Sequence, residues 1–438
     1  MAEAPGSSLL SAYRAVTSVV APPLSPLILA WRVRHGKEDP EHCAERRGIA
    51  SRPRPEGPLV WVHAASVGET VSVLPLIGRI LADGRFSILL TTGTITSTQI
   101  ANARLATMSA EPGRAIHQYV PHDGPHFVRR FLDHWKPGLA IFVESEIWPN
   151  LIVETARTGA RMALVNARMS DRSFRRWLKR AAMIRALLSR FDVCLAQSAA
   201  DAERLVALGA ERVVDTGNLK YDAPAPPADE TARNRLAAEL GERPRWLAAS
   251  LHSGEDEPAL DAHRALAERR SGLVTLIAPR HPERAPEIEA AAAARGLKTA
   301  MRSRGEAIGP DTDVYVFDTI GEMGLAYRLA PIVLMGGSLV RHGGQNPIEP
   351  AKLATAILHG PNVHNFADVY AALHDAGGAD EVADAGELAG RVGHFLDSPD
   401  DVARHAKAAN TAVAAYAGAL DRSMEAIEPL LAVAAKGA

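Results

Sequence analysis

The sequence predicts an α/β protein made of two doubly wound domains, each with a parallel sheet covered by helices. Short apolar runs alternate with helical patterns along most of the 438 residues, which is typical of parallel sheets. The alternation stops at a proline- and alanine-rich segment, residues 223–228, and then starts again, so we interpret this segment as a linker. The chain is also too long for one ordinary core, which favours two domains.

The first alternating series lies before the linker. Its expected strands are Val60–His63, Ser87–Thr91, Leu139–Val143, Arg161–Val165 and Val193–Ala196. Its expected helices are Val71–Leu81, Thr96–Ala106, Pro149–Thr158, Asp171–Ser189 and Ala199–Leu208. A helix follows most of the strands, so a sheet covered on both faces is the expected structure.

The second series follows the linker. Its expected strands are Trp246–Ala249, Leu273–Ala278, Val314–Phe317, Ile332–Met335 and Thr355–His359. Its expected helices are Pro258–Ala267, Glu283–Ala294, Gly321–Leu329 and Ala367–Ala376, and Pro399–Ala432 is expected to be nearly all helix. Two such domains form a cleft between their sheet edges, and we expect the ligand site there.

The N-terminal segment allows two interpretations. Residues 15–31 carry no charge but contain three prolines, which predicts a poor membrane span. One expectation is a helix or broken helix lying in the membrane interface, flanked by Tyr13, Trp31 and arginines. The other is a helix packed on the core of its own domain. The segment lacks a small-residue cleavage site, so we do not expect a cleaved signal peptide.

The composition is that of a globular protein, with 47% hydrophobic and 23% charged residues. The net charge of -2 gives no reason to expect a nucleic-acid partner. The two cysteines, Cys43 and Cys194, lie far apart and suggest a reducing compartment, with neither a disulfide framework nor a zinc site. The sequence also lacks the dinucleotide, Walker-type and zinc-helix fingerprints.

Basic residues gather in two regions, where they suit anionic lipid head groups or phosphorylated substrates, or form solvated helix faces. The first region contains Arg32, Arg34, Lys37, Arg46, Arg47, Arg52 and Arg54. The second contains Arg172, Arg175, Arg176, Lys179, Arg180, Arg185 and Arg190. Charge alone does not choose between these interpretations.

Ser66 and Glu69 lie where the first predicted strand turns into a helix. The carboxyl edge of a parallel sheet is where α/β proteins bind ligands. The helix dipole favours an ionised Glu69, which suits a general base. Ser-x-x-Glu is also a capping box, in which both side chains satisfy backbone N–H groups. The tetrapeptide alone favours capping.

Three further strand ends in the first domain carry polar residues. Glu144 and Glu146 follow one strand. Each is either functional or structural, and in the structural case one caps the helix and the other pairs with an arginine. Arg168 follows the next strand and can bind an acceptor phosphate or pair with either glutamate. Lys220 lies in the last loop before the linker, where a lysine can neutralise a phosphate or a leaving group, or be a solvated surface residue.

The second domain has matching loops at its strand ends. Candidate anion-binding groups are Ser250, His252, the clamp residue Arg280, the segment Ile320, Gly321 and Glu322, and the loop residues Gly337 and Ser338. The paired glycines give the backbone freedom to wrap a phosphate, although they are also compatible with tight turns alone. Glu349, one turn into a predicted helix, can accept hydrogen bonds from both hydroxyls of a ribose.

Taken in order, these segments resemble one family closely, the 3-deoxy-D-manno-octulosonic acid (Kdo) transferases of lipopolysaccharide assembly. The resemblance rests on HAASVGE at 63–69, ESEIWPN at 144–150, NARMSDRS at 166–173, GNLKYD at 217–222, PRHPER at 279–284 and GGSLVRHGGQNPIEPA at 336–351. It covers nearly the whole chain.

The resemblance implies a GT-B glycosyltransferase fold, with two Rossmann-like domains facing a central cleft. The implied parts are a membrane-associated segment at 1–35, an acceptor-binding domain at 36–222, a donor-binding domain at 223–410 and a returning helix at 411–438. At the positions that match the family's motifs, the resemblance implies that Glu69 is the general base. It implies that Glu144 and Lys220 support the transition state. Pro279, Arg280, Ile320, Gly321, Glu322, Asn346, Pro347, Ile348 and Glu349 match the segments that bind CMP.

The implied reaction moves Kdo from CMP-Kdo to the lipid A precursor, lipid IVA, at the cytoplasmic face of the inner membrane. The expected partners are CMP-Kdo, the phosphorylated lipid and the membrane surface, with Ser66 and Arg168 on the acceptor. No cofactor or metal is expected, because the donor has a single phosphodiester charge that protein cations can neutralise. Alternatives are another inverting GT-B transferase, a sugar-nucleotide epimerase and a non-catalytic phosphoglycolipid-binding protein.

Overall fold

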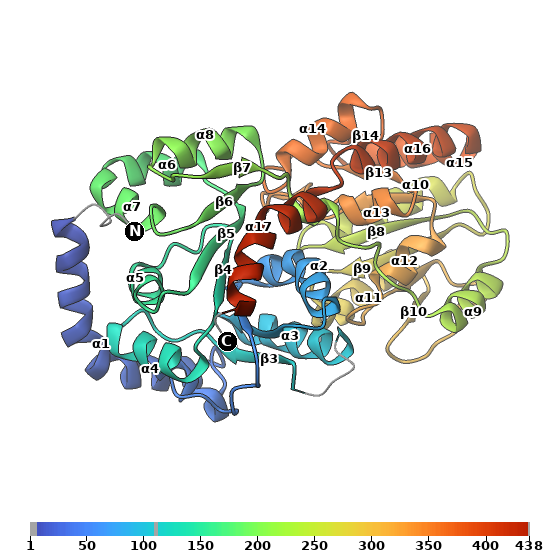
Figure 1. The fold of residues 1–438 in the computed structure, drawn as a ribbon. Helices are drawn as coiled ribbons and strands as arrows, with labels where there is room; N and C mark the ends of the chain where they lie inside the picture. Colours follow the sequence, from blue (N-terminus) through green and yellow to red (C-terminus); the bar gives the residue numbers. More distant parts are fainter. Residues whose placement is uncertain (1–6, 109–112, 437–438) are drawn as a thin grey trace. The chain divides into compact units, whose positions relative to one another are not determined.

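The computed structural model describes residues 7–108 and 113–436. The chain forms two compact units, drawn in Figure 1. Unit 1 comprises Met1–Ala223 and Ala417–Ala438, and unit 2 comprises Pro224–Tyr416. The predicted linker lies at the first crossing, and residues 224–229 contain neither helix nor strand. The second crossing follows α16 (Pro399–Ala415), a few residues after the domain boundary that was expected at residue 410.

Unit 1 contains a seven-stranded parallel sheet in the order β3-β2-β1-β4-β5-β6-β7. The strands are β1 (Leu59–His63), β2 (Ser87–Thr92), β3 (Ala115–Tyr119), β4 (Leu139–Val143), β5 (Arg161–Ala167), β6 (Val193–Ala196) and β7 (Val213–Asp215). The direction of winding reverses between the adjacent strands β1 and β4. In doubly wound sheets the ligand crevice lies at the carboxyl ends of such a pair.

Helices surround this sheet. They are α1 (Ser8–Arg34), α2 (Val67–Ala82), α3 (Ile95–Met108), α4 (Pro125–Trp135), α5 (Pro149–Arg157), α6 (Asp171–Leu178), α7 (Ala181–Leu188), α8 (Ala199–Ala207) and α17 (Ala419–Lys436), with short 3-10 turns η1 (Pro40–His42), η2 (Glu45–Arg47) and η3 (Leu219–Tyr221). The single helix predicted over Asp171–Ser189 is wrong. It divides into α6 and α7 because Arg180 leaves the helical conformation, with φ -130° and ψ 39°.

The N-terminal helix α1 is continuous, so Pro22, Pro23 and Pro26 do not break it. Tertiary hydrogen bonds fix it to unit 1, including the Tyr13 hydroxyl to Asp123 at 2.8 Å and the Ser25 hydroxyl with His122 at 3.0 Å. Most of the helix is nevertheless outside the core. By length and composition it could cross a membrane, and only 11% of its most apolar window is buried. The helix therefore packs on its own unit through one side, including Leu10 and Leu29, while most of its apolar surface stays exposed.

The two basic regions differ in structure. Arg46 of the first region is buried, and its guanidinium pairs with Glu38 at 3.0 Å, so this residue supports the fold rather than a surface patch. In the second region, the side chains of α6 line an open hollow on the surface of unit 1. They are Asp171, Arg172, Arg175, Arg176 and Lys179. Arg172, Arg175, Arg176 and Lys179 thus form an exposed basic surface on and directly after α6.

The returning helix α17 completes the core of unit 1. It packs against α2 and the strands β4, β5 and β6, and Figure 1 shows it in red beside this sheet. Its buried side chains share one apolar cluster with the strands. They include Ala419, Ile427, Leu430, Leu431 and Ala434. The last helix is thus an integral part of the first unit.

Unit 2 contains a second seven-stranded parallel sheet, in the order β10-β11-β9-β8-β12-β13-β14. The strands are β8 (Arg245–Leu251), β9 (Val274–Pro279), β10 (Thr299–Met301), β11 (Val314–Val316), β12 (Ile332–Met335), β13 (Ala356–His359) and β14 (Ala379–Glu381). Here the winding reverses between β8 and β12, which pair in parallel. The second crevice is therefore expected at the ends of β8 and β12.

The helices of unit 2 lie on both sides of its sheet. They are α9 (Glu230–Leu240), α10 (Asp256–Ala267), η4 (Pro282–Arg284), α11 (Ala285–Ala293), α12 (Met323–Leu329), α13 (Ile348–Lys352), α14 (Ala367–Asp375), α15 (Ala385–Asp397) and α16 (Pro399–Ala415). The helix predicted from Gly321 begins only at Met323, because Gly321 has φ 90°. Glu322 therefore precedes the helix instead of lying in its first turn.

Candidate active site

The turn after β1 places Glu69 in the first turn of α2, where it forms the capping box that the sequence predicted. The Glu69 N–H donates to the Ser66 hydroxyl oxygen at 3.4 Å. The Glu69 carboxylate accepts the Ala65 N–H at 2.7 Å and the Ser66 hydroxyl at 3.0 Å. The capping interpretation is therefore correct, and these contacts hold the carboxylate in one orientation.

The same carboxylate has the electrostatics of a base. Burial raises the pKa of Glu69 above its ordinary value, and the nearby charges of Glu146 and Glu144 raise it further. The hydrogen bonds from Ala65 and Ser66 lower the pKa but do not compensate. The net shift is upward, opposite to the direction that the helix dipole favours. A raised pKa makes the carboxylate a stronger base, which suits proton abstraction near neutral pH.

Glu144 directly follows β4, beside the end of β1. Its backbone is left-handed, with φ 55°, which is uncommon for a residue with a side chain and is often found at functional sites. The Glu144 carboxylate forms an ion pair with the Lys220 ammonium at 2.9 Å. The two side chains are 12% and 25% exposed, so each keeps a face open to solvent or ligand.

Asn166, which the sequence analysis did not single out, positions Lys220. It is fully buried at the end of β5 and also left-handed, with φ 54°. Its side-chain oxygen accepts the Leu219 N–H at 3.0 Å, so it fixes the start of the turn that carries Lys220. Asn218 caps the same turn by accepting the Lys220 N–H at 3.0 Å. An asparagine at a strand end was visible in the sequence, but its partner lies far along the chain.

Glu146 pairs with a histidine rather than with an arginine. Its carboxylate lies 3.2 Å from His63 Nε2 and accepts a hydrogen bond from the Trp148 indole. The other ring nitrogen of His63 lies 3.1 Å from the Thr91 hydroxyl. Burial raises the pKa of Glu146, but its bonds to His63 and Trp148 outweigh burial and lower it overall. Glu146 is therefore the carboxylate that stays charged beside Glu69.

Arg168 does not pair with the glutamates. It is exposed, and throughout the described part of the chain its guanidinium forms no ion pair, while its backbone N–H donates to the Glu144 carbonyl at 3.4 Å. Ser66 is also exposed at the start of α2. Both residues are thus open to a ligand at the edge of the first sheet.

In unit 2, Glu255 ties together the loops that follow β8 and β12. It is fully buried. Its carboxylate accepts the N–H groups of His252 at 2.8 Å, Gly337 at 2.6 Å, and Ser338 and Leu339 at 2.9 Å each. Sequence analysis missed this role, because the four donors come from two distant segments.

This arrangement changes the role predicted for Gly337 and Ser338. Their N–H groups hold Glu255 and are not free to wrap a phosphate. The Ser338 side chain is also engaged, since it donates to the Met335 carbonyl and accepts the Gly360 N–H at 2.7 Å. The glycines serve close packing, because a Cβ on Gly336 would lie 2.4 Å from the Ser250 carbonyl oxygen. Ser250 itself is left-handed, with φ 57°.

Histidines and Arg280 gather at the end of the second sheet. His252 stacks on His342 with ring centroids 3.7 Å apart, and its Nε2 lies 2.8 Å from the Gln345 side-chain nitrogen. Burial lowers the pKa of His252 to about 4, and the neighbouring charges of His342, His281 and Arg280 add to this effect. Positive potential of this kind suits an anionic ligand.

Glu349 lies within the electrostatic reach of Arg280. Burial raises the pKa of Glu349, and the charge of Arg280 opposes the shift. Asn346 fixes the entry to α13 by accepting the Ile348 N–H at 3.1 Å, and Pro347 precedes that helix as its cap. Pro279 is buried at the end of β9, directly before the exposed Arg280. The charge of Arg280 therefore acts on Glu349.

The residues of the 320–322 segment differ in exposure and in their contacts. Ile320 is 90% exposed, whereas the Glu322 carboxylate is engaged by Arg302 Nη2 at 2.6 Å and Nε at 2.9 Å. Glu322 cannot offer that carboxylate to a ligand without giving up Arg302. The exposed backbone around Ile320 and Gly321 remains available to a ligand.

Comparison with known proteins identifies the family. A sequence model of the family described as 3-deoxy-D-manno-octulosonic-acid transferase (kdotransferase) matches residues 41–223. The 3-deoxy-D-manno-octulosonic acid transferase of Bordetella pertussis is 37% identical over 433 residues, which cover 95% of this chain and 99% of the relative. The enzyme of the same name from Haemophilus influenzae is 34% identical over 421 residues, covering 93% and 96%.

Solved structures support the fold. A glycosyltransferase from Rickettsia africae superimposes with a TM-score of 0.59 at 12% identity, covering 86% of this chain and 99% of the other. That likeness and the two parallel sheets confirm the predicted α/β class and GT-B fold. This chain is 34% and 37% identical to these two curated relatives over nearly their whole length. It therefore belongs to the 3-deoxy-D-manno-octulosonic acid transferase family of glycosyltransferases.

Proposed function

We propose that this enzyme transfers Kdo from CMP-Kdo to a hydroxyl of the lipid A precursor, lipid IVA, with Glu69 as the general base. The observation that carries the proposal is the buried Glu69 carboxylate, fixed by Ala65 and Ser66 at the reversal point of the first sheet. Its raised pKa supports the role, because a base must hold a proton during the reaction and release it afterwards.

The proposed step is a single displacement. Glu69 takes the proton of the attacking hydroxyl, and that oxygen forms a bond to the anomeric carbon of Kdo as the bond to the CMP phosphate oxygen breaks. The electron pair of the broken bond leaves with CMP, and the configuration at the anomeric carbon inverts. Positive charge develops on the sugar ring in the oxocarbenium-like transition state. Carboxylates nearby stabilise such a charge, and Glu146, which keeps its negative charge, suits this task.

Positive groups would stabilise the departing CMP. The Lys220 ammonium forms an ion pair with Glu144 and has protons to donate to a phosphate oxygen. Arg280 in unit 2 has a planar guanidinium that suits bidentate contact with a phosphate. The CMP phosphodiester carries one negative charge, so these protein cations can neutralise it, and we propose that the chemical step needs no metal. We assign the ribose hydroxyls to Glu349, whose carboxyl group is within the electrostatic influence of Arg280.

We also propose that unit 1 binds the cytoplasmic face of the inner membrane through α1 and α6. The outer side of α1 exposes Val16, Val19, Leu24, Leu27, Ile28 and Trp31. The basic side chains of α6 are exposed as well, and α7 packs against both helices. Apolar insertion combined with attraction to anionic head groups gives stable peripheral binding.

The donor assignment is tested by measuring CMP release from CMP-Kdo with and without lipid acceptor. We expect release that depends on acceptor and is inhibited by CMP but not by UDP. Replacing Arg280 by alanine should raise the donor KM about 10-fold or more, because a charged hydrogen bond is worth about 1.5–3 kcal/mol. Arg269→Ala, at an exposed position on the same unit, is the matched control.

The outcomes separate the alternatives. Inhibition by UDP instead of CMP would indicate another nucleotide-sugar transferase. Lipid binding without any CMP release would indicate a non-catalytic phosphoglycolipid-binding protein. Either result would contradict the proposed reaction.

The membrane assignment predicts a specific response to charge. Co-sedimentation with vesicles containing anionic lipid should fall about 10-fold or more when Arg172, Arg175 and Arg176 are replaced by glutamate, since each basic residue contributes about 1 kcal/mol near such a surface. Binding to uncharged vesicles should change little. Equal binding of both proteins to anionic vesicles would exclude α6 from the membrane contact.

A further inference from the structure

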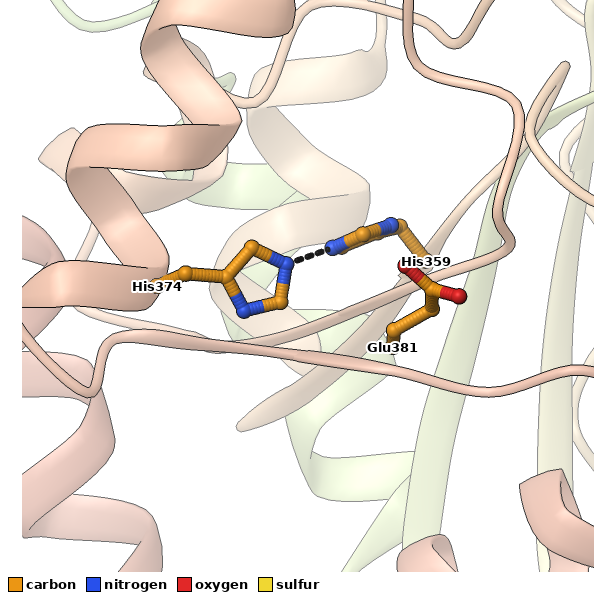
Figure 2. Close-up of side chains that lie close together, drawn as sticks. All are labelled: His359, His374 and Glu381. Carbon is orange, nitrogen blue, oxygen red and sulfur yellow. Dashed lines mark hydrogen bonds between the residues drawn. The ribbon is translucent and has the colours of Figure 1, made fainter.

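A cluster of metal-ligating side chains lies in unit 2, apart from the residues assigned to the reaction. His359 ends β13, His374 lies in the last turn of α14, and Glu381 ends β14. One ligand atom from each lies within 4.8 Å of the others. Figure 2 shows the two imidazoles facing each other, with the carboxylate beside His359. We propose that these three side chains form a Zn²⁺ site that fastens the edge of the second sheet.

The hydrogen bonding of His359 prepares it as a ligand. Its Nδ1 lies 2.7 Å from the Gly360 carbonyl oxygen, which can only accept, so Nδ1 carries the proton. The Nε2 of a neutral His359 therefore presents a lone pair toward the cluster. A backbone carbonyl that orients an imidazole in this way is the usual outer partner of a metal-bound histidine.

The Nε2 atom of His374 faces the lone pair on His359 Nε2. The two Nε2 atoms are 2.7 Å apart, which in the metal-free protein requires His374 to donate its proton to His359. Two nitrogens that share a tetrahedral zinc at about 2.0–2.1 Å each stand about 3.3 Å apart. The two Nε2 atoms would therefore have to move apart by about 0.6 Å to bind one zinc ion together. His374 is exposed, so its side chain is free to make this adjustment.

Glu381 supplies the negative charge. It is the direct register partner of His359 in the parallel pair β13–β14, so both side chains project from the same face of the sheet. The neighbouring Asp380 is engaged elsewhere, with Arg391 at 2.6 Å. Two imidazoles, one carboxylate and an exposed side open to water give four ligands for a tetrahedral ion. Magnesium and calcium prefer sites built of oxygen atoms, so the donor set favours Zn²⁺.

The proposed metal site would stabilise the edge of the second sheet, where the packing depends on a short strand. β14 has three residues and is the edge strand of its sheet. A metal shared by β13, α14 and β14 closes the chain segment between them, which lowers the entropy of the unfolded state. Gly360, the partner of His359, also donates to Ser338 at the end of β12. The metal is therefore a stabilising group for unit 2 and takes no part in the proposed transfer step.

The test uses the full-length protein without a histidine tag, stripped with chelator and titrated with Zn²⁺ against a chromophoric competitor. We expect one equivalent bound, and the visible absorption of tetrahedral Co²⁺ when cobalt replaces zinc. At 100 times the Kd, Zn²⁺ should raise the Tm by about 5 °C or more. His374→Ala and Glu381→Gln should weaken binding 10-fold or more, since each removes one of three protein ligands.

The control is His394→Ala, which removes an exposed histidine of α15 that pairs with Asp401 at 2.7 Å. It should bind zinc like the wild type. The substitutions are made at the exposed ligands because replacing the buried His359 could prevent folding. The absence of stoichiometric binding by the wild type, or equal binding by His374→Ala, would overturn the proposal. Because the readouts are stoichiometry, spectrum and Tm, they are independent of the transferase assignment.

Discussion

Replacing Glu69 by glutamine is expected to lower kcat about 10²- to 10⁴-fold, the usual contribution of a positioned general base. An amide is nearly the same size and still accepts one of the hydrogen bonds that Ala65 and Ser66 donate, but it cannot take a proton. The free energy of unfolding should change by about 1 kcal/mol or less, because the Ser66 cap remains. Acceptor-dependent CMP release and thermal unfolding measure the two effects.

Ser66→Ala is the matched control, since it removes the cap and leaves the carboxylate. We expect this variant to lose about 0.5–2 kcal/mol of stability and far less rate than Glu69→Gln, because the carboxylate loses one orienting hydrogen bond but remains a base. The opposite pattern, with a slow Ser66→Ala and an active Glu69→Gln, would mean that Glu69 is only a helix cap.

The pH dependence follows from the raised pKa of Glu69. The rate should rise with pH as the carboxylate deprotonates. Because the folded-state pKa lies above the unfolded value, the protonated group stabilises the fold below the ordinary glutamate pKa, and this stabilisation is lost as pH rises through the folded pKa. Glu69→Gln should therefore be more stable relative to the wild type at high pH than at low pH. A pH-independent difference in Tm would contradict this assignment.

Replacing Lys220 by methionine is expected to lower kcat about 10²- to 10³-fold, the usual cost of losing one donor to a developing negative charge. It also leaves Glu144 without its partner at 2.9 Å, in a position only 12% exposed. Stability should fall by about 1–3 kcal/mol, the cost of an unsatisfied buried polar group. The effect of Lys220→Met on kcat therefore has to be distinguished from its effect on the free energy of unfolding.

The double variant Lys220→Met, Glu144→Gln separates them. Removing the unpaired charge should restore most of the lost stability without restoring the rate, and Lys220→Arg should retain part of the rate because it retains the charge. Double-mutant cycles of kcat and of the free energy of unfolding measure the coupling. A double variant with near wild-type kcat would show that the lysine serves only to neutralise Glu144.

The predictable part of the fold came from its long buried strands. The ten expected strands all have counterparts, because continuous apolar runs bounded by polar turns are distinctive in parallel sheets. The sheet edges were missed: β3, with the sequence AIHQY, contains two adjacent polar residues, and β7, β10 and β14 have three residues each. Edge strands of this length lack a hydrophobic signal of their own.

The site was predictable at the level of loops and not of contacts. Strand ends located Glu69, Glu144 and Lys220, because polar residues after apolar runs mark the carboxyl edge of a sheet. The pairing of Glu146 with His63 and the anchoring of Gly337 by Glu255 join segments that are distant in sequence. Spacing alone carries no information about such partners, so Gly337 and Ser338 were assigned to phosphate, although their N–H groups donate to the Glu255 carboxylate.

The position of α17 has a consequence for synthesis on the ribosome. Unit 2 is one continuous stretch, whereas unit 1 needs residues from both ends of the chain. The apolar surface that Ile427 and Leu431 cover on the first sheet stays open until those residues emerge. Unit 1, although translated first, is therefore the last to close its core, and the nascent chain must keep an unfinished apolar face from aggregating while all of unit 2 is made.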